Sequence, residues 1–130
     1  MMRAVGTIAL CGVALATATP ALAETAPKST LKIVVVVDDL PKGATLTCDP
    51  DGGSHPTPAA ACDLLRKVKG DPSKLNVVPN PVCTDEYQPH TVVVVGKWRG
   101  TSLRWTYIFS NSCRMKAAGG AVFTVRPPAA

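Results

Sequence analysis

Two pairs of adjacent residues carry side chains that could take part in catalysis: Ser54 beside His55, and Asp85 beside Glu86. A hydrolase needs a nucleophile, a base within hydrogen-bond reach and an oxyanion site. Ser54 and His55 lie in a turn rich in Gly and Pro, without the G-x-S-x-G context of a nucleophile elbow. Asp85 and Glu86 lie on an extended segment, where adjacent side chains point in opposite directions. We therefore expect that the chain is not an enzyme.

The acidic pair belongs to a short polar segment, residues 83–89, that starts at a cysteine and ends at a proline. Pro79, Pro81 and Pro89 stiffen this part of the chain, because proline fixes φ and removes an N–H donor. A small domain has few reasons to hold exposed residues so firmly. The simplest reason is their presentation to the active site of a protease.

Residues 1–23 have the features of a secretory signal peptide. Arg3 supplies a positive charge, residues 4–18 are largely apolar, and Ala21-Leu22-Ala23 matches the A-x-A pattern of a cleavage site. A membrane anchor needs about 20 apolar residues, and this stretch is shorter. We expect cleavage after Ala23, leaving residues 24–130 as one secreted extracellular domain with no membrane attachment.

The cysteines predict a disulfide-stabilised domain. Cys11 is lost with the signal peptide, and an even number of cysteines in an exported chain predicts two disulfides. Four cysteines allow three pairings, and each bridge stabilises a small core by about 3 kcal/mol in the chain-entropy model. No C-x-x-C motif occurs and the two histidines lack ligand spacing, so we expect no metal and no cofactor. The paired residues are Cys48, Cys62, Cys83 and Cys113.

The charge of the chain excludes a nucleic-acid-binding protein. A net charge of +5 over 130 residues is too small and too scattered for that function. We interpret the basic residues of the C-terminal half as a solvated face, and the alternative is a site for an anionic polymer. These residues are Lys97, Arg99, Arg104, Arg114 and Lys116.

Runs of β-branched and aromatic residues predict about five strands. Five successive aliphatic residues from Ile33 to Val37 suggest burial on both faces, by the core and by a partner subunit. Residues 38–43 are predicted as a turn, and Arg99-Gly100-Thr101 as the turn of a hairpin. The predicted strands are residues 31–37, 44–48, 91–98, 102–110 and 122–125.

One helix is predicted, with Thr57 as N-cap, Pro58 at its first position and Gly70 as its stop. Residues 111–120 are predicted as a loop with one helical turn. The class is therefore α+β, a mostly antiparallel sheet with a helix on one face. The apolar stripe that faces the sheet consists of Ala61, Leu64, Leu65 and Val68.

Several segments spread over residues 24–130 carry a common pattern, with all four cysteines in place. They are TLTCDP at 45–50, SHP at 54–56, ACDL at 61–64, GKWRG at 96–100 and FSNSCRM at 109–115. Together they resemble the Streptomyces subtilisin inhibitor family. The resemblance implies a five-stranded antiparallel sheet with one main helix and a second short helix. It also implies disulfides Cys48–Cys62 and Cys83–Cys113, a homodimer, and substrate-like inhibition of extracellular serine proteases.

The resemblance further implies a reactive bond, the bond placed in the protease active site. In this chain that bond is Asp85–Glu86, and Asn111 matches a position that supports the loop from beneath. The protease-contacting residues implied on either side of the bond are Val82, Cys83, Thr84 and Tyr87.

Asp85 departs from the family, which usually has Met, Leu or Lys before the reactive bond. A carboxylate buried in an apolar primary pocket without a partner costs several kcal/mol, of order 3 to 5. The target is therefore either an acid-specific serine protease with basic or hydrogen-bonding groups in its pocket, or a subtilisin that reads Val82 and leaves Asp85 partly solvated. The alternative function is a non-inhibitory extracellular binding or structural protein that keeps the fold.

Overall fold

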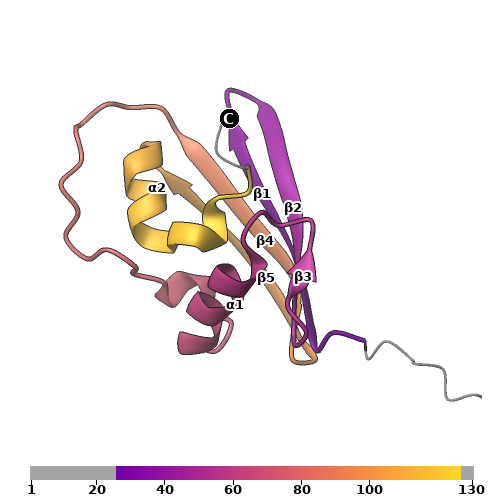
Figure 1. Cartoon of the computed structure of the whole chain (residues 1–130). Helices are drawn as coiled ribbons and strands as arrows, with labels where there is room; N and C mark the ends of the chain where they lie inside the picture. Colours follow the sequence, from indigo (N-terminus) through magenta and orange to yellow (C-terminus); the bar gives the residue numbers. More distant parts are fainter. Residues whose placement is uncertain (1–25, 127–130) are drawn as a thin grey trace, which may run out of the picture.

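A five-stranded antiparallel sheet forms the base of the fold (Figure 1). The computed structural model describes residues 26–126, so the predicted signal peptide at 1–23 lies outside the described residues. The strand order in the sheet is β3-β2-β1-β4-β5. The strands are β1 (Ser29–Val37), β2 (Leu40–Cys48), β3 (Gly52–Gly53), β4 (His90–Trp98) and β5 (Thr101–Phe109).

The aliphatic strand β1 lies at the centre of the sheet. Val34 is paired with Gly43 of β2 on one side and with Val93 of β4 on the other. Ile33 and Val35 point to the inner face and are buried, whereas Val34 on the outer face is only half-buried. The sequence prediction of an apolar strand is therefore confirmed, and its burial is complete on one face only.

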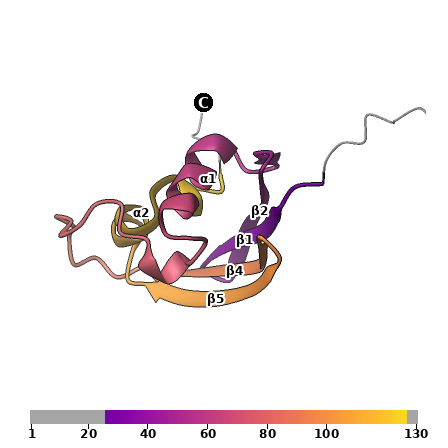
Figure 2. The ribbon, with the colours of Figure 1, turned by 90° about the horizontal axis from the view of Figure 1, so that it is seen from below.

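Both helices lie on the same face of the sheet (Figure 2). They are α1 (Pro58–Lys67) and α2 (Ser112–Gly119), and each is followed by a short 3₁₀ helix, Pro72–Lys74 and Gly120–Phe123. The apolar stripe of α1 packs on the sheet, as its 3.6-residue spacing predicts. The fully buried residues between the layers include Leu31, Ile33, Leu46, Leu65, Val92, Val94, Val122 and Phe123.

The helix α1 ends at Lys67, three residues before the predicted stop at Gly70, and Gly70 closes the turn that follows it. Its φ is +78°, and its N–H donates to the Leu65 carbonyl over 2.8 Å, which closes the last helical turn. A Cβ at this position would lie 2.2 Å from the indole of Trp98. Only glycine therefore allows the chain to turn here and Trp98 to pack against it.

The two disulfides have the pairing that the family resemblance implies. Cys48–Cys62 joins the end of β2 to α1 across 14 residues, and Cys83–Cys113 joins a loop to α2 across 30 residues. The Cα atoms are 5.8 Å apart in both bridges, within the usual range. The first bridge is fully buried in the core, and the second lies near the surface.

The C-terminal part of the fold corrects two sequence predictions. Residues 122–125 do not form a strand, because residues 120–123 form a 3₁₀ helix that inserts Val122 and Phe123 into the core. The fifth strand is instead β3, which pairs with β2 at Leu46 and Thr47. Residues 111–120 are mostly helical rather than a loop, because Asn111 caps the start of α2.

Both hairpin turns are also tighter than predicted. The β1–β2 turn consists of Asp38 and Asp39 alone, with φ values of 52° and 64°, and β2 starts at Leu40 rather than at Ala44. Pro41 is tolerated in β2 because β3 covers only the other end of this strand, which leaves Pro41 on a free edge. The β4–β5 turn likewise has two residues, Arg99 and Gly100, both with positive φ. Such two-residue turns match the twist of the strands that they join.

Within residues 26–126, neither α-helix has the length and hydrophobicity that crossing a membrane requires.

His55 links the β3–α1 segment to the C-terminal 3₁₀ helix. Its ring is 3% exposed, Nε2 donates to the Val122 carbonyl over 3.2 Å, and Nδ1 accepts from the Thr57 N–H over 3.0 Å. These partners fit the neutral ring. Burial lowers the pKa of His55 below its usual value, and the carbonyls of Val122 and Ala121 oppose this in part.

We expect His55 to make the fold sensitive to acid. Its pKa is lowered on folding, so the unfolded chain takes up the proton first as the pH falls below about 6.5, and the free energy of unfolding then decreases. Above that pH, His55 does not change the free energy of unfolding with pH. Urea unfolding between pH 8 and pH 5 measures the effect. His55→Asn should lose about 1 kcal/mol at pH 8 but show a shallower fall with acid, and parallel curves for the two proteins would contradict this role.

Candidate functional site

The segment between the 3₁₀ helix Pro72–Lys74 and β4 leaves the body of the domain as a wide loop (Figures 1 and 2). Residues 76–89 have no regular secondary structure, as their prolines predict. At its tip the side chains are open to solvent: Val82 is 99% exposed and Tyr87 is 76% exposed, and Asp85 and Glu86 are exposed as well. We call residues 82–87 the presented segment.

Backbone hydrogen bonds hold the loop at both ends. On the entry side, the N–H groups of Val77 and Val78 donate to the carbonyls of Ala118 and Ala117 in α2, over 3.1 and 2.7 Å. On the exit side, the Gln88 N–H donates to the Ser110 carbonyl over 2.8 Å. The loop therefore has fixed ends, although its tip projects from the domain.

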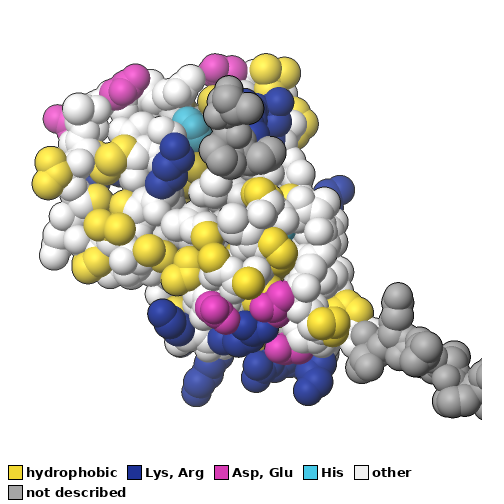
Figure 3. All heavy atoms as spheres, in the orientation of Figure 1, with side chains coloured by type: hydrophobic (Ala, Val, Ile, Leu, Met, Phe, Trp, Pro, Cys, Tyr) yellow, Lys and Arg dark blue, Asp and Glu magenta, His cyan; other side chains and the backbone are white. Residues whose placement is uncertain are grey.

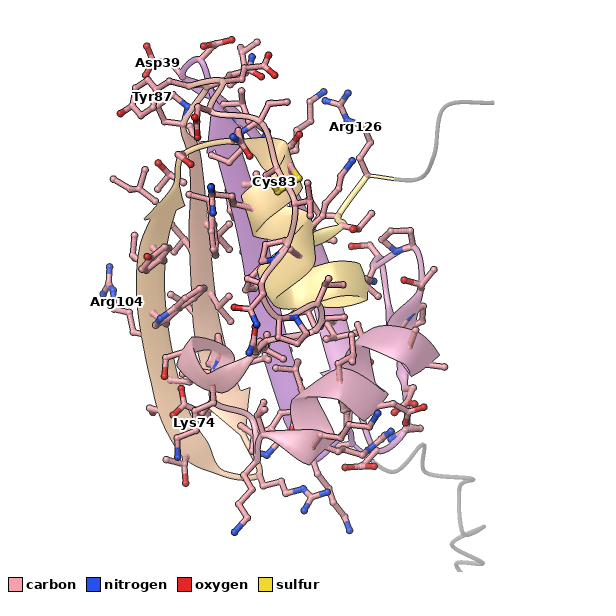
Figure 4. All side chains as sticks on the ribbon, turned by 90° about the vertical axis from the view of Figure 1, so that its left-hand side faces the viewer. Asp39, Lys74, Cys83, Tyr87, Arg104 and Arg126 are labelled. Atoms are coloured by element: carbon pink, nitrogen blue, oxygen red, sulfur yellow. A yellow bond between two sulfur atoms is a disulfide. The ribbon has the colours of Figure 1, made fainter. Side chains whose placement is uncertain are left out.

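A disulfide holds the presented segment on its N-terminal side. Cys83 is bonded to Cys113 in the first turn of α2 (Figure 4). The bridge connects the loop to an element whose backbone is already hydrogen-bonded. The position of Cys83 is therefore set by the position of α2.

Asn111 holds the middle of the presented segment. Its side-chain amide Nδ2 donates to the carbonyl of Thr84 over 3.1 Å and to the carbonyl of Glu86 over 2.8 Å. Its Oδ1 accepts the backbone N–H of Arg114 over 3.0 Å, which caps α2. The residue is 5% exposed, and every polar atom of its side chain has a partner. One side chain thus starts a helix and supports the loop above it.

These contacts hold the backbone on both sides of the Asp85–Glu86 peptide bond. The carbonyls of Thr84 and Glu86, which Asn111 holds, lie on either side of it, and the disulfide lies two residues before it. On the side of the loop, all of these contacts use backbone atoms or the cystine, so the side chains of Asp85 and Glu86 remain free for another molecule. The arrangement presents an extended, stiffened backbone with exposed side chains, which is how a substrate enters a protease.

The β1–β2 turn lies beside the exit of the loop, a feature that the sequence did not indicate. Figure 4 shows Asp39 next to Tyr87 at the same end of the sheet. Gln88 Nε2 lies 3.5 Å from Asp38 Oδ2, and the Gln88 carbonyl is 2.8 Å from His90 Nδ1. From the sequence, the two aspartates were predicted only as a polar turn. Their closeness to the loop depends on the pairing of β1 with β4, whose partner residues are more than 50 positions apart in the sequence.

The serine–histidine pair has a structural role. Ser54 Oγ accepts the Thr45 N–H over 2.9 Å, and both ring nitrogens of His55 already have backbone partners. The two side chains therefore do not form a nucleophile and its base. Cys48 and Cys62 lie close to Asp51, but their sulfurs form a disulfide and offer no thiolate to a metal.

A family model described as subtilisin inhibitor-like matches residues 28–111. A subtilisin inhibitor of Streptomyces violaceus is 47% identical over 81 residues, which are 61% of this chain and 56% of that protein. A subtilase-type protease inhibitor of Streptomyces coelicolor is 44% identical over 84 residues, which are 64% of this chain and 58% of that protein. The chain thus spans somewhat more than half the length of these relatives.

A solved structure extends the similarity to the fold. The crystal structure of Streptomyces caespitosus sermetstatin in complex with Bacillus licheniformis subtilisin aligns with a TM-score of 0.60 and 30% identity. The alignment covers 73% of this chain and 96% of that one. The family model accounts for well over half of the sequence, and the strands, helices and disulfides agree with the expected architecture. The chain belongs to the subtilisin inhibitor-like family.

Proposed function

We propose that this protein is a secreted inhibitor of extracellular serine proteases, and that it offers the Asp85–Glu86 bond to the active site in the manner of a substrate. The observation that carries this proposal is the support of the presented segment by Asn111, which holds the carbonyls on both sides of that bond. The names of the relatives, which are protease and subtilisin inhibitors, agree with it.

The physical basis of inhibition is a loop that is already ordered before it binds. Ordering the backbone of a flexible segment costs about 1–2 kcal/mol for each residue, and much of that cost is avoided here because the backbone is already held. If the protease cuts the bond, the disulfide Cys83–Cys113 still joins the two parts of the chain. Both new ends then stay near the active site, so the bond can be remade and the protease stays occupied.

The side chain before the bond selects the protease. Asp85 would enter the primary pocket as a carboxylate, and an unpaired buried charge is more costly than a missing apolar contact. The target is therefore a serine protease whose pocket supplies basic or hydrogen-bonding groups, or a subtilisin that binds mainly through Val82. Val82 is almost fully exposed and is free to fill an apolar subsite.

Inhibition assays of the purified protein against subtilisin and against a glutamate-specific serine protease test the proposal. We expect at least one of them to be inhibited at submicromolar concentration. A folded, disulfide-bonded protein that leaves both enzymes fully active at micromolar concentration would sink the proposal.

Replacing Asp85 by Lys should create an inhibitor of trypsin. A lysine in the primary pocket of trypsin pairs with a carboxylate, so inhibition should rise from none to strong, whereas the stability should stay unchanged because Asp85 is exposed. Thr84→Lys and Glu86→Lys are matched controls that move the same charge by one residue. Trypsin inhibition assays and urea unfolding measure the two effects. Inhibition by a control but not by Asp85→Lys would show that the reactive bond is not Asp85–Glu86.

Asn111→Ser should convert a slowly cleaved inhibitor into a better substrate. Serine keeps the helix cap, but its shorter side chain has one hydroxyl hydrogen and cannot replace the two hydrogen bonds to the carbonyls of Thr84 and Glu86, which contribute about 1 kcal/mol each. We expect the inhibition constant to rise about tenfold or more, with faster cleavage of the loop. Asn111→Ala should in addition lose about 1 kcal/mol of stability. Asn76→Ser, on an exposed residue, is the control; equal inhibition by it and by Asn111→Ser would contradict the role.

We further propose that the protein is a homodimer formed through the outer face of the sheet. Both helices lie on the other face (Figure 2), so no element of residues 26–126 covers this one. Strand pairing aligns its residues in rows, for example Val34, Val93 and Thr106. Two such sheets packed about 10 Å apart would bury these apolar rows. The apolar residues of the outer face are Val34, Val36, Val93, Val95 and Ile108.

Sedimentation equilibrium at micromolar concentration should therefore give the mass of a dimer. Val93→Asp places a charge at the centre of the face, where desolvation penalises it, and should give a folded monomer. Circular dichroism checks the fold of the variant. A monomeric wild-type protein at these concentrations would refute the dimer.

A further inference from the structure

The end of the sheet that bears the presented segment carries four acidic side chains. Asp38 and Asp39 form the β1–β2 turn, and Asp85 and Glu86 flank the proposed reactive bond. All four side chains are exposed. Figure 3 shows acidic side chains at both ends of the molecule, and Lys and Arg side chains are more prominent at the lower end than at the upper end.

The other acidic residues of the described chain already have partners. Asp49, Asp51 and Asp63 form ion pairs with Arg66, at 3.0 Å for Asp49 and 2.5 Å for Asp63. The hydrogen bond from Arg66 to Asp51 is the main reason that the pKa of this guanidinium is raised. Asp71 accepts from the N–H and hydroxyl of Ser73, over 3.0 and 2.6 Å, at the start of a 3₁₀ helix.

By contrast, the four carboxylates at the loop end form no ion pair within residues 26–126, where every ion pair involves Asp49, Asp51 or Asp63. Asp38 has a single long contact, 3.5 Å from the side-chain amide of Gln88. Lys42, Lys116 and Arg126 line the same hollow as Asp38, but none of them forms an ion pair with the four carboxylates. The loop end therefore carries four carboxylates that no ion pair within the described residues neutralises.

Strand pairing sets which side of the reactive bond the turn approaches. Val36 of β1 pairs with Thr91 of β4, so β1 ends where the loop enters β4. The turn after β1 thus lies beside Tyr87 and Gln88, which follow the proposed bond (Figure 4). The leaving-group subsites of a protease bind the residues that follow the cleaved bond. A protease bound at Asp85–Glu86 would therefore place the rim of these subsites close to Asp38 and Asp39.

We propose that the Asp38–Asp39 turn is a second contact with the protease, and that the partner is a serine protease with lysine or arginine residues on the rim of its leaving-group subsites. This inference rests on the proposed function and adds the charge character of the target. Four unpaired carboxylates on one face repel each other weakly in the free protein, and a cationic surface relieves that repulsion. Complementary charge of this kind acts mainly on the association rate and fades with salt.

The test measures association rate constants with subtilisin and with a subtilisin variant that carries two lysines on the rim of its leaving-group subsites. Both inhibitor forms carry Asp85→Met, which suits the apolar primary pocket, and one form also carries Asp38→Asn and Asp39→Asn. Asparagine tolerates positive φ, so the turn should be kept. At low salt, the lysine-bearing subtilisin should associate about 3- to 10-fold faster with the form that retains both aspartates. The difference should shrink at about 0.5 M salt.

A charge-matched control separates local contact from net charge. Thr101→Lys with Ser102→Lys, at the opposite end of the sheet, changes the net charge by the same amount. These two changes should leave unchanged the ratio of the association rate with the lysine-bearing subtilisin to that with unmodified subtilisin. Equal association rates with and without the two aspartates would overturn the inference while inhibition persists. If no form inhibits either subtilisin, the proposed function itself fails, and the inference falls with it.

Discussion

Much of this structure depends on the side chain of Asn111. Its oxygen caps α2 and its amide holds two carbonyls of the presented segment, so a single residue joins the start of a helix to the loop above. Two residues later, Cys113 fixes the same loop through its disulfide. The position of the loop therefore depends on the position of α2. The helix in turn is held by the packing of Phe123 against Gly119, where a Cβ would lie 2.0 Å from the phenyl ring.

This arrangement separates stability from specificity. Asn111 and the hydrogen bonds at the loop ends act on backbone groups, and the disulfide acts at Cys83, so the side chains at 82 and 84–87 are not needed to keep the loop in place. They can change without cost to the core, because all of them are exposed. The same holds for Asp38 and Asp39, which need only a short turn that permits positive φ. In the proposed function, the choice of protease is therefore left to exposed side chains on a backbone of fixed position.

Sequence analysis predicted the elements that depend on local pattern. The aliphatic strand from Ile33 to Val37 and the start of α1 at Pro58 follow from composition and periodicity. It failed where tertiary contacts decide. Val122 and Phe123 look like a strand but fill a gap between α1, α2 and the sheet. The proximity of Asp38 to Gln88, and the exact partners of Asn111, depend on long-range pairing that no local pattern encodes. The pairing of the cysteines came from the family resemblance and not from their spacing.

The most direct test of the central claim is to locate the bond that the protease attacks. The protein is incubated with a small amount of whichever enzyme it inhibits, subtilisin or the glutamate-specific protease, and the products are mapped by peptide mass before and after reduction. The account predicts one cut, at Asp85–Glu86, in a protein that gains the mass of one water and separates into two pieces only when Cys83–Cys113 is reduced. Adding fresh enzyme to the cut form should restore intact chain. A first cut elsewhere, or steady degradation without return of intact chain, would contradict it.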